Sequence, residues 1–280
     1  MPAQFIRVVL LFATLGLLGL DKAQAANGPS CDGRAEIIIH NAYPDATKRD
    51  DETFQFGGST ISIKEGETVS DTPHMIKCRV WPANPHLTLV AVPLIKSSND
   101  DGTMGDLELL VIDTATDAVK HRLLLDNRMT DDAVSISAIE FDTAPYRLAK
   151  DQIAFGLRIS TANSSRPNPY DNVSLWLYVI DKGSLRPVLD GMIVSERTGE
   201  WDTNCAGEFQ SKQTTLSMAA NKTREFAEIM TVETKSTKTS FVEKDQSCKD
   251  TTVTSKPQIL RLIYDGEHYP IPDDRRAMTE

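Results

Sequence analysis

The chain has 280 residues, and its 30 lysines and arginines against 40 aspartates and glutamates give a formal net charge of −10. With 40% hydrophobic and 25% charged residues, the composition is that of an ordinary folded protein, which excludes a collagen-like, coiled-coil or largely disordered chain. The acidic balance argues against a nucleic-acid partner, because nucleic-acid binding needs a basic surface.

The first 25 residues have the pattern of an export signal. Arg7 lies in a charged start, an apolar run follows from Val8 to Leu20, and Ala23-Gln24-Ala25 fits a small-x-small cleavage site. The apolar run is shorter than the roughly 20 residues that a membrane-spanning helix needs. We therefore predict that residues 1–25 are a cleaved signal peptide and that the mature protein is soluble, periplasmic or secreted, with no membrane anchor.

All four cysteines follow this segment, and an even number of cysteines in an exported chain favours disulfides. Zinc is the weaker alternative, because the sequence has neither Cys-x-x-Cys nor a histidine at ligand spacing. Two bonds that each close a loop within one end of the chain are the preferred pairing. The predicted disulfides are Cys31–Cys78 and Cys205–Cys248.

Short runs rich in Val, Ile, Leu, Thr and Tyr alternate with Gly, Pro, Asn and Asp clusters, which predicts an all-β protein. The runs at Leu87–Ile95 and Leu109–Ile112 are apolar on both faces, so we expect central strands that are covered on two sides. The expected strands, in chain order, are Ala35–His40, Phe54–Phe56, Thr60–Ile63, Ile76–Trp81, Leu87–Ile95, Leu107–Asp113, Val119–Leu125, Val134–Phe141, Ile153–Ile159, Val173–Ile180, Leu185–Leu189, Phe226–Val232 and Ile259–Tyr264.

A weak internal repeat consists of a strand that ends in aspartate, a turn and a further short apolar strand. Asp113, Asp181 and Asp265 hold the equivalent place, where the carboxylate can accept a turn N–H. These three aspartates are spaced more widely than the roughly 40–50 residues of ordinary propeller blades. We predict a small irregular β-propeller-like array of antiparallel strands, with a β-sandwich as the alternative.

No strong domain boundary is visible in the sequence. Residues 26–82 are expected to form an N-terminal β subdomain that the first disulfide closes, and residues 83–280 to form a β-repeat domain. Within the second, the polar segment Thr231–Lys256 predicts exposed hairpin strands that a disulfide at Cys248 would tether.

Candidate metal ligands lie between Ser97 and Glu108. When the segment is aligned on Gly102, it nearly matches the twelve-residue calcium loop, but Ser97 stands where that loop needs aspartate. The flanking residues also predict strands and not helices, so an acidic hairpin loop without metal is the main expectation and no other cofactor is expected. The four candidate calcium ligands are Asn99, Asp101, Asp106 and Glu108.

Catalytic motifs are absent from the sequence: it contains no Gly-x-Ser-x-Gly, no His-Glu-x-x-His and no phosphate-binding loop. We therefore expect a β-scaffold that binds an unknown protein or cell-envelope ligand. The alternatives are a cell-envelope hydrolase with a site in a propeller pocket, and a calcium-stabilised structural module. Trp201 is a candidate contact for a partner or a sugar ring, unless it packs over the disulfide at Cys205.

Overall fold

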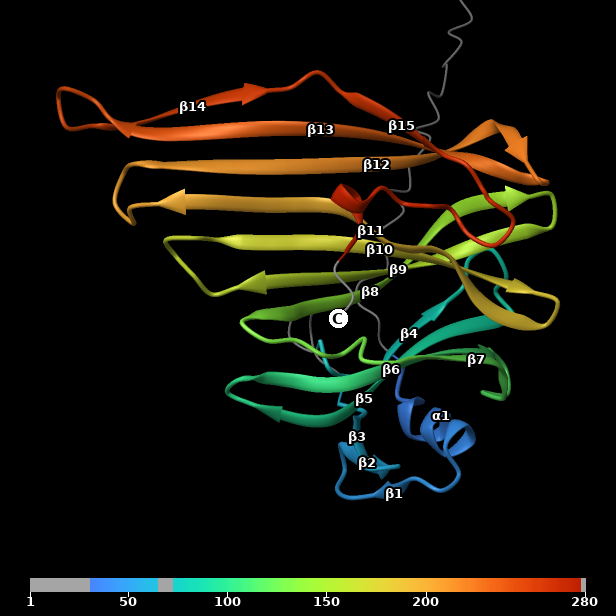
Figure 1. Cartoon of the computed structure of the whole chain (residues 1–280). Helices are drawn as coiled ribbons and strands as arrows, with labels where there is room; N and C mark the ends of the chain where they lie inside the picture. Colours follow the sequence, from blue (N-terminus) through green and yellow to red (C-terminus); the bar gives the residue numbers. More distant parts are fainter. Residues whose placement is uncertain (1–30, 65–72, 278–280) are drawn as a thin grey trace, which may run out of the picture.

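The computed structural model describes residues 31–64 and 73–277, and the expected signal peptide lies outside them. Most of the described chain forms strands in two antiparallel sheets, here called sheet A and sheet B (Figure 1). The all-β, antiparallel prediction is therefore confirmed. Two sheets that pack face to face match the sandwich alternative more closely than a set of propeller blades.

Sheet A contains the first seven strands in the order β1-β2-β3-β5-β6-β7, and β4 pairs with β5. The predicted boundary at residue 82 falls inside this sheet, since β4 and β5 lie on either side of it and are hydrogen-bonded. The strands are β1 (Thr47–Lys48), β2 (Thr53–Phe56), β3 (Ser59–Ser62), β4 (Lys77–Val80), β5 (Leu87–Asn99), β6 (Gly102–Asp113) and β7 (Val119–Leu125).

The helix α1 (Ala35–Ala42) stands where the sequence predicted a strand, and that prediction was wrong. Three consecutive isoleucines suggested β structure, but the buried positions recur with helical spacing, at Ala35, Ile38, Ile39 and Ala42. This helix packs its buried side against sheet A, and the Cys31–Cys78 disulfide joins the residues before it to β4. Among the described residues, no helix has the length and hydropathy to span a membrane.

Sheet B has the order β14-β13-β12-β11-β10-β9-β8, and β15 also pairs with β13. The polar segment Thr231–Lys256 forms much of β13 and β14, as predicted, whereas β12 was not predicted at all. The strands are β8 (Val134–Ala149), β9 (Gln152–Asn163), β10 (Tyr170–Asp181), β11 (Ser184–Trp201), β12 (Gly207–Thr223), β13 (Phe226–Val242), β14 (Cys248–Thr254) and β15 (Gln258–Leu262).

The main core lies between the two sheets. Leu89 and Val111 of sheet A pack there with Phe155 and Tyr178 of sheet B. On the same strands of sheet A, the alternate residues such as Val90 face α1 instead. Strands β5 and β6 are thus covered on two sides, which confirms the prediction made from their continuous apolar runs.

A C-terminal segment, Tyr264–Ala277, fills a split in sheet B. Strands β11 and β12 pair only through Ser195–Trp201 and Gly207–Gln213. The earlier half of β11 bonds to this segment instead: the Tyr269 N–H donates to the Val188 carbonyl at 2.7 Å, and the Ala277 N–H donates to the Gly191 carbonyl at 2.7 Å. The short helix η1 (Asp273–Arg275) lies within the segment, which Figure 1 shows in red beside β11.

The internal repeat is present in two of its three copies. Strands β5–β7 and β9–β11 are three-stranded meanders, but the third copy lacks its last strand, because His268–Ile271 is not a strand. Asp113 and Asp265 accept turn N–H groups as expected. Asp181 instead pairs with Arg186 at 3.0 Å, and a two-residue turn with Gly183 closes its hairpin.

Candidate functional site

A groove of about 670 Å³ opens on the face of sheet B that packs against sheet A. Its walls come from strands β8–β11, from the β7–β8 connection at residues 126–132, and from the end of the C-terminal segment. Three parts of the chain that are far apart in sequence therefore meet in one concave site. The volume lies within the roughly 300–1,000 Å³ of small-molecule sites.

One wall of the groove carries a ladder of amide and hydroxyl groups. Tyr170, Asn172 and Ser174 alternate along β10 and so share one face of the sheet. The Asn172 amide donates to the Tyr170 hydroxyl oxygen at 2.7 Å, and Asn163 on β9 accepts the Tyr170 backbone N–H at 3.0 Å. These bonds, together with the contact of Ser174 Oγ with Asn172 Oδ1 at 3.5 Å, hold the side chains in place along the groove wall. Isoleucines line the space beside them, at Ile136, Ile159 and Ile193.

The inner end of the groove is built around Trp176, which is only 4% exposed. Its indole Nε1–H donates to Asp190 at 3.1 Å. On one side, the Arg128 guanidinium carbon lies 4.6 Å from the ring centroid, in a cation–π contact. The backbone of Gly191 approaches so closely that a Cβ there would lie 3.0 Å from the ring. We call Arg128, Trp176, Gly191 and Arg276 the arginine end of the groove.

Arg128 is the least satisfied polar side chain of this site. Only 17% of it is exposed, yet it makes no side-chain hydrogen bond within the described residues, and its Nη2 lies 3.9 Å from Asp190. Its Nη1 is buried without a partner, as is the Tyr178 hydroxyl. Burial raises the pKa of Tyr178, and the Arg128 charge acts in the opposite direction. A guanidinium with five N–H donors is thus held here with almost none of them used.

Most carboxylates around the groove are already engaged. Asp131 accepts the backbone N–H groups of Thr103 at 2.9 Å and Ile136 at 2.8 Å. Asp132 accepts the N–H of Val134, and Glu196 forms an ion pair with Lys212 at 2.8 Å. These acids therefore shape the connection and the rim. Glu196 is paired with a lysine, whereas Asp131 and Asp132, like the lining residue Asp126, keep a negative charge beside the groove.

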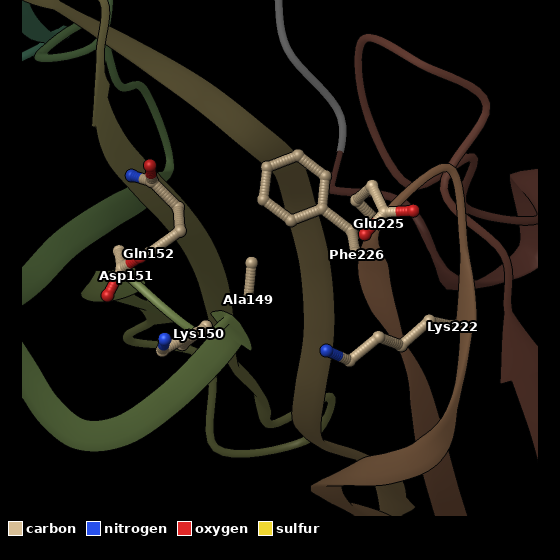
Figure 2. Close-up of a pocket in the computed structure, with 7 residues that line it drawn as sticks. All are labelled: Ala149, Lys150, Asp151, Gln152, Lys222, Glu225 and Phe226. Carbon is tan, nitrogen blue, oxygen red and sulfur yellow. The ribbon is translucent and has the colours of Figure 1, made fainter.

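A second hollow lies between the β8–β9 turn and the β12–β13 hairpin (Figure 2). Its volume is about 280 Å³, and Lys150 and Lys222 line it together with Asp151 and Glu225. This volume is below the usual range for small-molecule sites, and charges of both signs are mixed around it. The larger groove is therefore the better candidate.

The four candidate calcium ligands do not come together in one site. Asn99 and Asp101 lie at the β5–β6 turn, where the Asn99 side chain accepts the Asp101 N–H. Asp106 and Glu108 share a face of β6; since a strand rises about 3.3 Å per residue, Glu108 lies roughly 20 Å along the strand from that turn. Asp106 pairs with Lys96 and Glu108 pairs with Arg122, each at 2.7 Å. The described residues contain no group of three or more His, Cys, Asp or Glu arranged to hold a metal.

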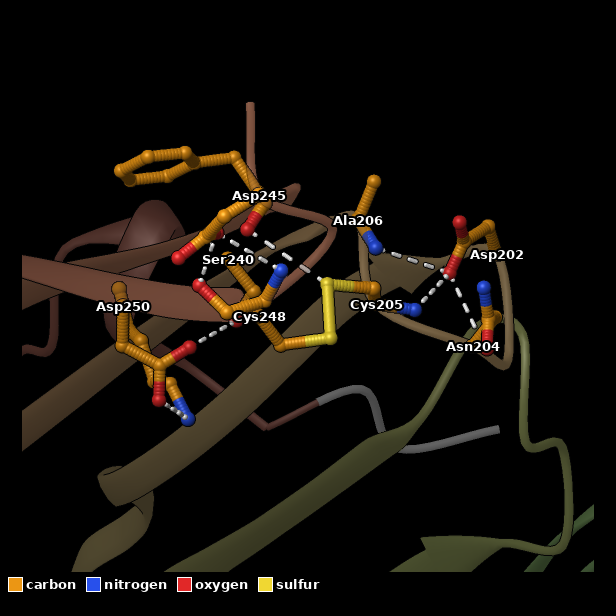
Figure 3. Close-up of a disulfide and its surroundings, with 11 residues drawn as sticks. Asp202, Asn204, Cys205, Ala206, Ser240, Asp245, Cys248 and Asp250 are labelled. Atoms are coloured by element: carbon orange, nitrogen blue, oxygen red, sulfur yellow. Dashed lines mark hydrogen bonds and ion pairs between the residues drawn. A yellow bond between two sulfur atoms is a disulfide. The ribbon is translucent and has the colours of Figure 1, made fainter. Parts of the chain in front are cut away.

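Both predicted disulfides are present, and Figure 3 shows the second of them. Beside it, Asp202 accepts the N–H groups of Asn204, Cys205 and Ala206, which fixes the β11–β12 turn. Trp201 precedes this turn and is half-buried. It pairs across the strands with Gly207, whose Cβ position would lie 3.0 Å from the indole Cδ1. Its ring thus packs against the opposite strand, and Trp201 is not among the residues that line the groove.

The sequence analysis did not identify the groove residues. A usable signal was present in the Tyr170–Trp176 segment, where polar residues at alternate positions lead to a tryptophan and so mark one polar face of a strand. Arg128 carried no such signal, because only the fold places it over the Trp176 ring. Comparisons with protein-family models, curated proteins and solved structures found nothing that matches this chain.

Proposed function

We propose that the protein is an exported binding module, with its ligand site in the groove of sheet B. The observation that carries this proposal is the groove itself: about 670 Å³, with apolar side chains, an amide and hydroxyl ladder, and an unsatisfied arginine. Such a mixture of apolar surface and a few oriented polar groups is typical of ligand sites. The two disulfides support an oxidising, exported environment, with a periplasmic or secreted location as the proposal.

Binding is preferred over catalysis because of the chemistry of the lining. The described residues that line the groove include no histidine, cysteine or lysine, and three of the four lining acids are engaged, Asp131 and Asp132 by backbone N–H groups and Glu196 by Lys212. The polar groups present are oriented by one another, which suits recognition of a polar ligand. A cell-envelope fragment or a segment of a partner protein is the proposed ligand.

A thermal unfolding screen with two matched variants tests this proposal. Short peptides and cell-wall sugars are added singly to the oxidised protein. A ligand at 100 times its Kd adds about 2.7 kcal/mol of stability, which raises the Tm of a chain of this size by roughly 5–10 °C. Asn172→Trp fills the groove and should abolish the shift. Asn221→Trp makes the same change at an exposed site outside the groove and should preserve it. A shift that survives Asn172→Trp would place the ligand elsewhere.

A further inference from the structure

We infer that the arginine end of the groove binds the carboxylate of a peptide C-terminus, with the peptide body lying along the amide and hydroxyl ladder of β9 and β10. This inference rests on the proposed function, because it names the ligand of the same groove. Four features of the described residues support it.

The first feature is the unused hydrogen-bonding capacity of Arg128. Its guanidinium is largely buried and stacked on Trp176, and it has no side-chain hydrogen bond within the described residues. Its Nη1 is fully enclosed, so a ligand in the groove would meet the Nε and Nη2 side of the guanidinium. A carboxylate supplies two acceptor oxygens that match the guanidinium fork in two parallel charge-assisted bonds.

The second feature is Arg276, a second arginine at the same end. Its backbone forms a bridge with Met192, and the next residue bonds to Gly191, so the C-terminal segment fixes Arg276 beside the β11 residues that hold Trp176. Arg276 is exposed and makes no ion pair within the described part of the chain; one of its donors goes to the Ile271 carbonyl at 3.1 Å. Arg128 and Arg276 thus both line the groove. The bridge to Met192 aligns the Arg276 side chain with the face of sheet B that carries Met192, so Arg128 is the group placed to hold the carboxylate.

The third feature is the state of the neighbouring carboxylates, which would otherwise repel an anion. Asp131 and Asp132 accept backbone N–H groups, and Glu196 is paired with Lys212. Asp190 is 62% exposed and accepts the indole N–H, at 3.9 Å from Arg128. Asp126, Asp131 and Asp132 line the groove and keep their negative charge. The attraction for a ligand carboxylate is therefore local to the Arg128 guanidinium, where the exposed charge of Asp190 is screened by solvent.

The fourth feature favours a peptide over an acidic sugar. Sugar sites commonly offer an open aromatic face, but the Trp176 ring is covered by Arg128 and by the Gly191 backbone. The groove wall instead sets isoleucines beside amide and hydroxyl groups, the alternation of apolar and hydrogen-bonding character that a peptide presents.

The test compares N-acetyl-trialanine carrying a free C-terminal carboxylate with the same peptide as a carboxamide. Each is titrated into ¹⁵N-labelled protein up to its solubility limit, and the indole N–H signals of Trp81, Trp176 and Trp201 are followed by NMR. The acid should shift the Trp176 signal saturably and leave Trp201 unmoved. The affinity for the amide should be at least about tenfold lower than for the acid, because the amide lacks the charge-assisted pair of bonds.

Three substitutions separate the role of Arg128 from a loss of folding. Arg128→Gln should reduce the affinity for the acid to that for the amide, and Arg128→Lys should give an intermediate value, because it keeps the charge but not the fork. Arg197→Gln is the control: it removes an exposed arginine that pairs with Asp171 outside the groove lining, and should leave both affinities unchanged.

Equal affinities for acid and amide would overturn the carboxylate inference and leave the groove as a binding site. A Trp176 signal that neither peptide shifts would also overturn it. The proposed function would then be decided separately, by the thermal unfolding screen that compares Asn172→Trp with Asn221→Trp. If Arg128→Gln still binds the acid more tightly than the amide, Arg128 does not bind the carboxylate and the inference is overturned.

Discussion

The close packing of the Trp176 ring against the backbone of β11 depends on the glycine at position 191. Gly191 has φ of 77°, and a Cβ there would lie 3.0–3.2 Å from three ring atoms. Gly183 has a similar φ of 82° with no atom within 4 Å of its Cβ position, so it is a matched control. Gly183→Ala should cost about 1–2 kcal/mol of unfolding free energy from backbone strain alone, and Gly191→Ala about 1–3 kcal/mol more from the clash. Urea unfolding measures both free-energy changes. Equal losses for the two variants would contradict the close contact between Gly191 and the Trp176 ring.

A second residue-scale prediction concerns Tyr43, which ties the end of α1 to sheet A. Its hydroxyl donates to Glu108 at 2.5 Å, and burial together with that bond raises its pKa well above the usual value. A raised folded-state pKa stabilises the protein fully below pH about 10, and that contribution is lost as the pH rises through the folded-state value. Tyr43→Phe should therefore flatten the fall of unfolding free energy in alkaline solution. An unchanged slope would show that Tyr43 contributes nothing to it.

Residues 207–213 of β12, residues 234–242 of β13 and the whole of β14 form a largely exposed wing that the second disulfide holds together. Cys248 at the start of β14 is joined to Cys205 in the β11–β12 turn, and β14 is exposed along its whole length. Replacing both cysteines by alanine should cost about 2–4 kcal/mol and speed amide hydrogen exchange in β14. Amide exchange in the groove strands β8–β10 should stay slow, because β14 pairs with β13 and not with these strands. Faster exchange throughout those strands would contradict this separation.

The β12–β13 hairpin turns through two residues that both have positive φ, Arg224 at 49° and Glu225 at 69°. A two-residue turn of this kind favours glycine at its second position, as Lys182-Gly183 provides in the β10–β11 hairpin. Glu225→Gly should therefore stabilise the protein by about 0.5–1 kcal/mol. A lower thermal unfolding midpoint would instead assign the Glu225 side chain a stabilising contact.

Local pattern was a good guide to elements with one or two apolar faces. Strands β5, β6 and β10 were predicted because they are largely buried and their sequences therefore contain continuous apolar runs. Strand β12 was not, because its half-buried face mixes polar Lys212 with apolar Leu216 and Met218, which weakens the apolar period. Helix α1 was misassigned because its isoleucines favour β structure locally, and only packing against sheet A settles its conformation.

At the scale of the whole molecule, the groove is lined by segments that only the fold brings together, and the C-terminal segment is one of them. Hydrogen bonds of Tyr269 and Ala277 hold this segment against β11 and place Arg276 and Ala277 in the groove lining. Arg128 arrives from the connection between the two sheets. Such long-range placement leaves no local pattern, so the sequence predicted the β-scaffold and its disulfides but not the site.

The most direct test of the central claim is a crystal structure of the protein soaked with short peptide acids and cell-wall fragments. The account predicts ligand density in the groove, with a carboxylate at Arg128 and the ligand body against Tyr170 and Asn172. Density confined to the hollow at Lys150 and Lys222, or a groove that stays free of ligand while the same compounds raise the Tm, would contradict it.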